Sequence, residues 1–134
     1  MTAKPAISTV PFSPRIDSEP SRSAGRVAVV GARSRVQSHA FICELVTIGE
    51  DCFVGHGVTF INDAFASGGP ARGKKELWRE TVIGNRVSIG SNATIMPVRI
   101  ADDVVIGAGS VVTRDIMAAG TYAGNPARLL KLRE

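Results

Sequence analysis

Three polar side chains in the middle of the chain carry groups that can take part in a reaction. His56 and Asn62 stand six residues apart, and Asp63 follows directly. An imidazole titrates close to neutral pH and suits a general base, whereas an amide orients a nucleophile without titrating. A carboxylate such as that of Asp63 shapes a turn, or holds an amine or a hydroxyl. The roles open to these residues depend on the elements that carry them.

These elements follow from a six-residue repeat that runs through most of the chain. An aliphatic residue or Phe leads each repeat, with a break after Phe60 and a one-residue slip before Ile100. The leads are Val30, Val36, Ile42, Ile48, Val54, Phe60, Ile83, Ile89, Ile95, Ile100, Ile106 and Val112. Six residues fit a short strand and a corner but no helical period, so the chain is predicted to be all-β, a left-handed parallel β-helix. Glycine follows six of the leads, where it permits a tight corner, and three strands to a coil give about four coils.

Two segments depart from this repeat. Residues 1–26 are polar and rich in proline, and we expect them to form an extended or disordered arm. Residues 27–117 are predicted to form the β-helix domain. Residues 63–80 break the hexads and contain several glycines, so they are predicted to project from it as a loop.

The C-terminal tail, residues 118–134, lies beyond the last repeat. Asn125 can cap a helix, and Pro126 suits the first turn of one. We therefore expect a short C-terminal helix, which would cover the exposed strand edge of the last coil.

Residues eighteen positions apart lie above one another on successive coils, so the repeat also predicts neighbours. His56 falls over Ser38, with Ser91 above it, and Asn62 falls over Glu44. A purely structural interpretation remains open for both side chains: a hydrogen bond from His56 to Ser38, and one from Asn62 to Glu44 or the local backbone. Asn62 also stands at the root of the projecting loop, where a site on a rigid scaffold is expected.

Composition and charge exclude several classes of protein. No apolar run approaches the roughly 20 residues of a membrane helix, and the N-terminus lacks the apolar core of a signal peptide. Two cysteines are too few for a disulfide scaffold or a four-ligand zinc site, so a cytoplasmic protein without a metal is expected. The net charge of +4 is scattered and aromatic residues make up 5%, which favours a small anionic ligand over nucleic acid.

From residue 52 onward the chain resembles a known family. The motifs that carry the resemblance are GHGVTFIND from Gly55, PAR from Pro70, the loop residue Trp78, IGSNATIMP from Ile89, IGAGSVVTRD from Ile106 and GNPAR from Gly124. In combination they look like the hexapeptide-repeat N-acetyltransferases that acylate amino groups on nucleotide-linked sugars. The resemblance implies acetyl-CoA as donor, a nucleotide-linked amino sugar as acceptor, a homotrimer, and active sites in the clefts between neighbouring solenoids.

The resemblance also implies roles for particular residues. The family's Asn that matches Asn62 contacts the sugar amine. By its own chemistry, rather than by the resemblance, His56 is the rival candidate as a base, and Asp63 is a third catalytic candidate. Backbone groups at Ser91, Ala108 and Gly109 are expected to hold the pantetheine of CoA. Arg114, Arg128 and Lys131 are candidates for binding its phosphates. Arg72 and Glu44 are candidates for binding the acceptor.

Other functions fit the same fold. O-acetylation of a sugar or antibiotic hydroxyl needs a real base, which His56 would have to supply. A non-catalytic, structural β-helix needs no ligand at all. A zinc hydratase needs three histidine ligands, and the chain has only His39 and His56, so this possibility is set aside.

Overall fold

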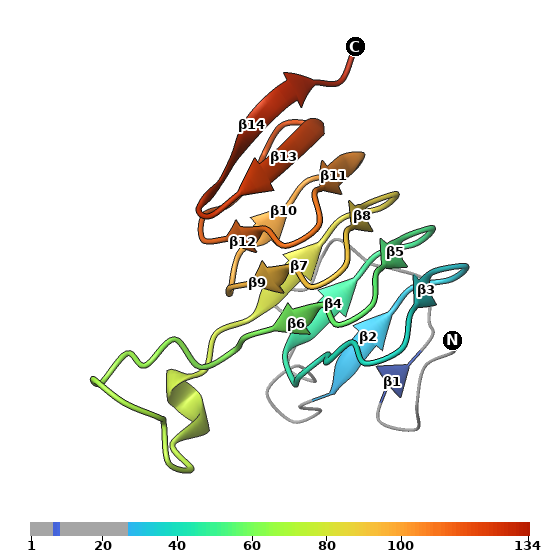
Figure 1. The fold of residues 1–134 in the computed structure, drawn as a ribbon. Coiled ribbons are helices and arrows are strands. Elements are labelled where there is room, and N and C mark those ends of the chain that lie inside the picture. Colours follow the sequence, from blue (N-terminus) through green and yellow to red (C-terminus); the bar gives the residue numbers. More distant parts are fainter. Residues whose placement is uncertain (1–6, 9–26) are drawn as a thin grey trace.

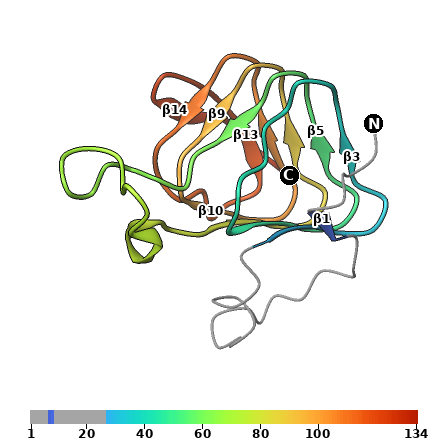
Figure 2. The ribbon, with the colours of Figure 1, turned by 90° about the horizontal axis from the view of Figure 1, so that it is seen from below.

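The computed structural model describes residues 7–8 and 27–134, whose short strands form three sheets. The sheets are the faces of a prism, and the chain passes from face to face in successive coils (Figures 1 and 2). Sheet A has the order β1 (Ile7–Ser8), β2 (Ala28–Val30), β4 (Val46–Ile48), β7 (Thr81–Ile83), β10 (Arg99–Ile100). Sheet B has the order β14 (Ala127–Leu132), β13 (Gly120–Gly124), β11 (Val104–Ile106), β8 (Ser88–Ile89), β5 (Phe53–Val54), β3 (Arg35–Val36). Sheet C has the order β12 (Val111–Val112), β9 (Thr94–Ile95), β6 (Thr59–Phe60).

Each coil adds one parallel strand to each sheet. Val30 pairs with Ile48, and Ile48 pairs with Ile83, so the register of sheet A resumes after the long segment between β6 and β7. Residues 27–134 contain four such coils: β2 and β3 with the bridge residue Phe41, then β4–β5–β6, β7–β8–β9 and β10–β11–β12. The left-handed parallel β-helix predicted from the repeat is confirmed.

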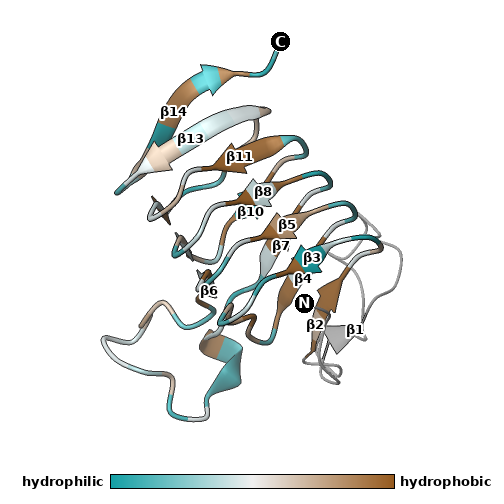
Figure 3. Cartoon of the chain, turned by 45° about the vertical axis from the view of Figure 1, so that its right-hand side comes forward, coloured by the Kyte–Doolittle hydropathy of each residue, from teal (hydrophilic) through white to brown (hydrophobic). Residues whose placement is uncertain are grey.

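The lead positions of the repeat form the core of the prism. Eleven of the twelve leads are buried, and Ile42 is half-buried against the same cluster. Phe60, the largest of them, is completely buried. Figure 3 shows brown, apolar stretches on strands such as β2, β5 and β11, and teal, polar stretches at the corners that follow β3, β5, β8 and β11.

The glycines that follow the leads allow successive coils to approach closely. A Cβ on Gly31 would lie 2.5 Å from the carbonyl oxygen of Gly49, and a Cβ on Gly90 would lie 2.5 Å from the backbone nitrogen of Ala108. None of these three glycines has a positive φ, so the turn of the chain does not require them. The sequence therefore predicted their positions correctly, but their physical role is contact between coils rather than a tight corner.

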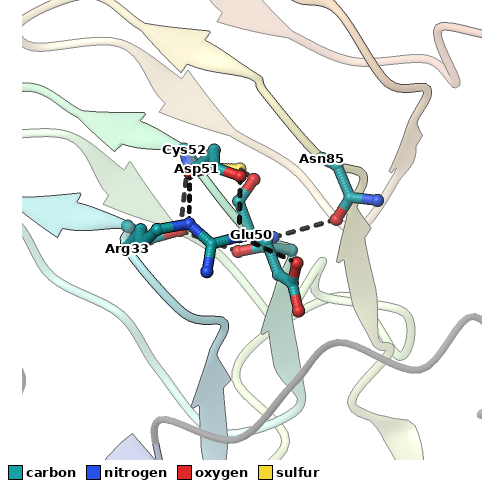
Figure 4. Close-up of polar contacts among 7 residues, drawn as sticks. Arg33, Glu50, Asp51, Cys52 and Asn85 are labelled. Carbon is teal, nitrogen blue, oxygen red and sulfur yellow. Dashed lines mark hydrogen bonds and ion pairs between the residues drawn. The ribbon is translucent and has the colours of Figure 1, made fainter.

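The corner between sheets A and B carries a column of paired charges. Arg33 donates from Nε to Asp51 Oδ1 at 2.8 Å and from Nη2 to Glu50 Oε1 at 3.2 Å (Figure 4). On the later coils, Arg86 donates from Nε to Asp103 Oδ1 at 2.9 Å. These hydrogen bonds lower the pKa of Asp51 and that of Asp103. Because the pairs lie at the surface, each contributes little stability. In each pair, an arginine of one coil lies against an acidic residue of the next coil.

The C-terminal segment forms a β-hairpin, so the short helix predicted there is wrong. β13 continues sheet B by pairing parallel with β11, and β14 pairs antiparallel with β13, with Gly124 opposite Ala127. The free edge of β13 is thus covered by another strand rather than by a helix. Asn125 and Pro126, which also suit a turn, occupy the bend of the hairpin.

A loop leaves the β-helix between β6 and β7 and carries the 3-10 helix η1 (Lys75–Leu77). It projects away from the prism in both ribbon views (Figures 1 and 2). The arm predicted over residues 1–26 lies outside the described residues, except that β1 pairs parallel with β2. Within the part of the chain that the structure describes, no helix is long and apolar enough to cross a membrane.

Replacing Gly90 by Ala is expected to lower the free energy of unfolding by about 1–3 kcal/mol, because the new Cβ would overlap the backbone of Ala108. Gly69→Ala is the matched control, since a Cβ there would meet no atom within 4 Å. Urea unfolding followed by circular dichroism measures both variants. Equal stability of the two would contradict the close approach of the coils at Gly90.

Candidate active site

Four of the predicted site residues lie in one column, at the corner between sheets B and C. His56, Ser91 and Ala108 each precede a residue with a positive φ, which turns the chain toward sheet C. The amide of Asn92 donates to the carbonyl oxygen of His56 at 2.7 Å, and the amide of Gly109 donates to that of Ser91 at 2.8 Å. The predicted stacking of Ser91 above His56 is confirmed, and Ala108 and Gly109 continue the column.

The later levels of this column are open to a ligand. Ser91, Ala108 and Gly109 are exposed, and a Cβ on Gly109 would meet no atom within 4 Å. A long, extended molecule can therefore approach the backbone along the corner. This is where the family resemblance implies that the pantetheine lies.

His56 is exposed, and its ring makes no hydrogen bond to another described residue. The hydrogen bond from the His56 ring to Ser38, which the structural interpretation requires, is absent. Ser38 instead accepts a hydrogen bond at its backbone carbonyl, from the amide of Gly57 at 3.1 Å. A general base is normally held in one orientation by a partner on its second nitrogen. Within the described part of this single chain, no group does so for His56. No group of three or more His, Cys, Asp and Glu in that part could hold a metal ion.

Asn62 lies at the opposite edge of sheet C from His56 and is only 9% exposed. Its Nδ2 donates to the carbonyl oxygen of Glu44 at 3.0 Å, as the structural interpretation predicted. This contact fixes the orientation of the amide, because a carbonyl can only accept. Oδ1 receives no hydrogen bond from another described residue and keeps contact with solvent. The amide is thus anchored by its nitrogen and presents its oxygen.

The Asp63 carboxylate is occupied by the backbone of the loop. Oδ1 accepts from the amide of Phe65 at 3.1 Å, and Oδ2 accepts from the amide of the buried Ala71 at 2.8 Å. The carbonyl oxygen of Asn62 accepts from the amide of Arg79 at 2.9 Å, which closes the loop at its other end. Asp63 is therefore a positioning residue that shapes the loop beside Asn62.

The two candidates for acceptor binding lie in different surroundings. Glu44 lies directly beside Asn62 and is half-buried, and its Oε1 is 3.5 Å from Nζ of Lys75. Arg72 is exposed on the loop with a φ of 55°, and its side chain contacts no other described residue by a hydrogen bond or ion pair. The structure brings Glu44 to Asn62 and leaves Arg72 apart.

The three cations predicted to bind phosphates also separate. Arg114 and Arg128 line one pocket of about 390 Å³ between the end of β12 and the hairpin. Lys131 lines another, of about 250 Å³, with Arg133. Two of the three side chains can therefore act on one anionic group.

Sequence reasoning missed a larger groove beside the loop. It has a volume of about 630 Å³, and its lining includes Trp78, Arg79 and Arg99. Arg99 precedes the lead Ile100, so the repeat did indicate that its side chain points outward. Trp78 and Arg79 lie in the part of the loop that returns to the β-helix, and the sequence of this loop has no repeat from which their position could be predicted.

The site residues thus fall into two groups on opposite edges of sheet C. The column of Ser91, Ala108 and Gly109 lies at one edge, and Asn62 with Glu44 lies at the other, with β6 between them. Within one chain, the two groups therefore stand before and after the strand β6 rather than side by side.

Comparisons with known proteins find the same repeat in acetyltransferases. Residues 45–61 and 80–114 match the family model of the hexapeptide repeat of succinyl-transferase. A probable macrolide acetyltransferase of Lysinibacillus sphaericus is 34% identical over 115 residues, which are 71% of this chain and 64% of the relative. The chain thus carries the hexapeptide repeat of this family model and is similar to named acetyltransferases.

Solved structures show the same similarity. A maltose O-acetyltransferase from Clostridium difficile 630 is 30% identical with a TM-score of 0.65, over 80% of this hexapeptide-repeat chain and 59% of the other. A hexapeptide-repeat acetyltransferase from Vibrio cholerae, complexed with acetyl-CoA, is 25% identical with a TM-score of 0.59. The match covers 80% of this chain and 58% of the Vibrio cholerae chain. This chain spans 64% or less of the length of the curated relatives it matches.

The role of Asp63 in this hexapeptide-repeat protein can be tested by proteolysis. Asp63→Ala removes the acceptor of two loop amides, so trypsin is expected to cleave faster after Arg72, Lys74 or Lys75. Asp115→Ala is the matched control, because its carboxylate also accepts a backbone amide, that of Arg99 at 2.8 Å, but outside the loop. Equal cleavage rates in the two variants would contradict the positioning role.

Proposed function

We propose that the protein is an acetyl-CoA-dependent acyltransferase that acetylates the amino group of a nucleotide-linked amino sugar. The neutral amine attacks the thioester carbon, a C–N bond forms as the C–S bond breaks, and the departing thiolate or water takes the proton. Similarity to named acetyltransferases supports acyl transfer, and the motifs from Gly55 to Arg128 that resemble amino-sugar N-acetyltransferases support the acceptor.

The observation that carries this proposal is the orientation of Asn62. Its Nδ2 is fixed on the Glu44 carbonyl, and its Oδ1 keeps contact with solvent. An amine donates an N–H to such an oxygen while its lone pair stays free to attack. The amide thus orients a neutral nucleophile without competing for its proton.

The donor fits the opposite edge of sheet C. An acetyl-CoA complex is known for the Vibrio cholerae relative, and in this chain the exposed column of Ser91, Ala108 and Gly109 leaves room for the pantetheine. Arg114 and Arg128, which share one pocket, are suited to a phosphate group of CoA. We assign no phosphate contact to Lys131, which lines a separate pocket.

Donor and acceptor meet at one site when a second chain contributes one of the two edges. A homotrimer provides this arrangement, because its heterologous interfaces bring different edges of neighbouring prisms together. Phe41, Phe53 and Val105 remain exposed on the outer faces of sheets B and C, and burying them would stabilise the assembly.

O-acetylation is the second candidate, and the named acceptor of the maltose O-acetyltransferase favours it. A hydroxyl must lose its proton to a base as it attacks, and His56 is the residue that would accept it. In a trimer, an orienting partner for the His56 ring would have to come from the neighbouring chain. A non-catalytic structural role is disfavoured, because the matched relatives are named as acetyltransferases.

Two alanine variants separate these candidates in an assay of CoA release with acetyl-CoA and nucleotide-linked amino sugars. Amine acetylation predicts that Asn62→Ala lowers kcat/KM about 100-fold, through lost orientation of the nucleophile. His56→Ala is expected to stay within about twofold of the wild type.

The matched control is Asn85→Ala, whose Oδ1 likewise accepts a backbone contact, from the amide of Glu50 at 2.9 Å, but at another corner. It is expected to retain activity. A severe loss in His56→Ala with a mild one in Asn62→Ala would replace the proposal by O-acetylation. Absence of CoA release from the folded wild type with every amine and hydroxyl acceptor would contradict both.

A further inference from the structure

Two residues that line the groove of about 630 Å³ beside the loop are close to Asn62 in the fold. Leu45 directly follows Glu44, whose carbonyl holds the Asn62 amide. Pro97, also in the lining, lies one coil above Asn62, because Phe60 pairs with Ile95. A substrate whose amine reaches Asn62 therefore has this groove beside the rest of its body.

Charges of both signs line the groove in equal number. The cationic residues are Lys75, Arg79 and Arg99, and the acidic residues are Glu76, Glu80 and Asp115. Some of these groups already have partners within the groove. Arg99 Nη2 lies 3.6 Å from Glu80 Oε2, and the backbone amide of Arg99 donates to Asp115 Oδ1. A diphosphate would meet as many carboxylates as cations, whereas hydroxyl groups both donate and accept and so can use both kinds.

Trp78 adds an aromatic wall to this polar lining. It is half-buried, and Nζ of Lys75 lies 5.3 Å from the centroid of its ring. Its Nε1 is buried and has no hydrogen-bond acceptor among the described residues. A buried donor without an acceptor is uncommon, and a ligand hydroxyl is an acceptor that a small rotation of the ring would bring within reach. The apolar C–H face of a pyranose also packs well against an indole.

We propose that this groove binds the sugar ring of the acceptor, with the nucleotide lying outside it. The inference rests on the proposed function only in that Asn62 receives the amine of the same sugar. Its chemistry is that of an uncharged or amino-substituted hexose held by guanidinium, carboxylate and indole groups.

The test uses the intrinsic fluorescence of Trp78, the only tryptophan of the chain. Glucosamine and glucose are expected to produce a saturable change in the emission of the full-length protein, whereas UDP, dTDP and CoA at the same concentrations are not. Glycerol controls for the effect of a polyol on the solvent. Saturable changes with the nucleotides and none with the sugars would overturn the proposal.

A pair of matched variants locates the binding. Arg99 and Arg35 each open a two-residue strand with an exposed side chain, on sheets A and B respectively. Arg99→Gln is expected to weaken glucosamine binding about tenfold by removing charge-assisted hydrogen bonds, and Arg35→Gln is expected to bind as the wild type does. Equal binding by both variants would overturn the assignment to this groove.

Turnover separates this inference from the proposed function. Glucosamine binding that depends on Arg99, in a protein that releases no CoA with any acceptor, would leave the groove standing and remove the acyltransferase. CoA release with an amino-sugar KM that Arg99→Gln does not change would leave the acyltransferase standing and remove the groove.

Discussion

The close hydrogen-bonded stacking of one coil on the next determines the rest of this molecule. Strands on neighbouring coils lie about 4.8 Å apart, a spacing that leaves no room for a side chain where the glycines of successive coils meet. The stacking converts separation along the sequence into position along a column. Ser91, Ala108 and Gly109 thereby form a continuous exposed edge, although Ser91 belongs to one coil and Ala108 and Gly109 belong to the next.

Within residues 27–134, the long interruption of that stacking forms the loop beside Asn62, at the edge that we propose for the acceptor. The loop leaves after Asn62 and returns with Arg79, and the backbone contact between these two residues closes it. The Asp63 carboxylate holds the inner part of the loop, and the Glu44 carbonyl holds the Asn62 amide. A regular backbone thus provides the edge suited to the donor, and an irregular loop provides the edge suited to the acceptor. The width of sheet C keeps the two edges of one chain apart.

The repeat predicted the fold and the core because a period of six residues leaves few alternatives. It also predicted which residues stack, including Asn62 over Glu44, since that follows from counting. The C-terminal helix was predicted wrongly because Asn125 and Pro126 suit a hairpin bend as well as a helix start. The hairpin forms because β14 pairs with the otherwise open edge of β13. The contacts of Asp63 and the groove at Trp78 depend on where an aperiodic loop returns, which no spacing in the sequence encodes.

We propose an arrangement in which each site takes its acceptor edge from one chain and its donor edge from another. It is tested by mixing two inactive variants, Asn62→Ala and Ala108→Trp, the latter filling the exposed corner of the donor column. After joint unfolding and refolding, with light scattering to verify the assembly, equal amounts should recover about one quarter of the wild-type activity, because one interface in four pairs two intact edges. Mixed assemblies without activity, or a fully active monomer, would contradict the account.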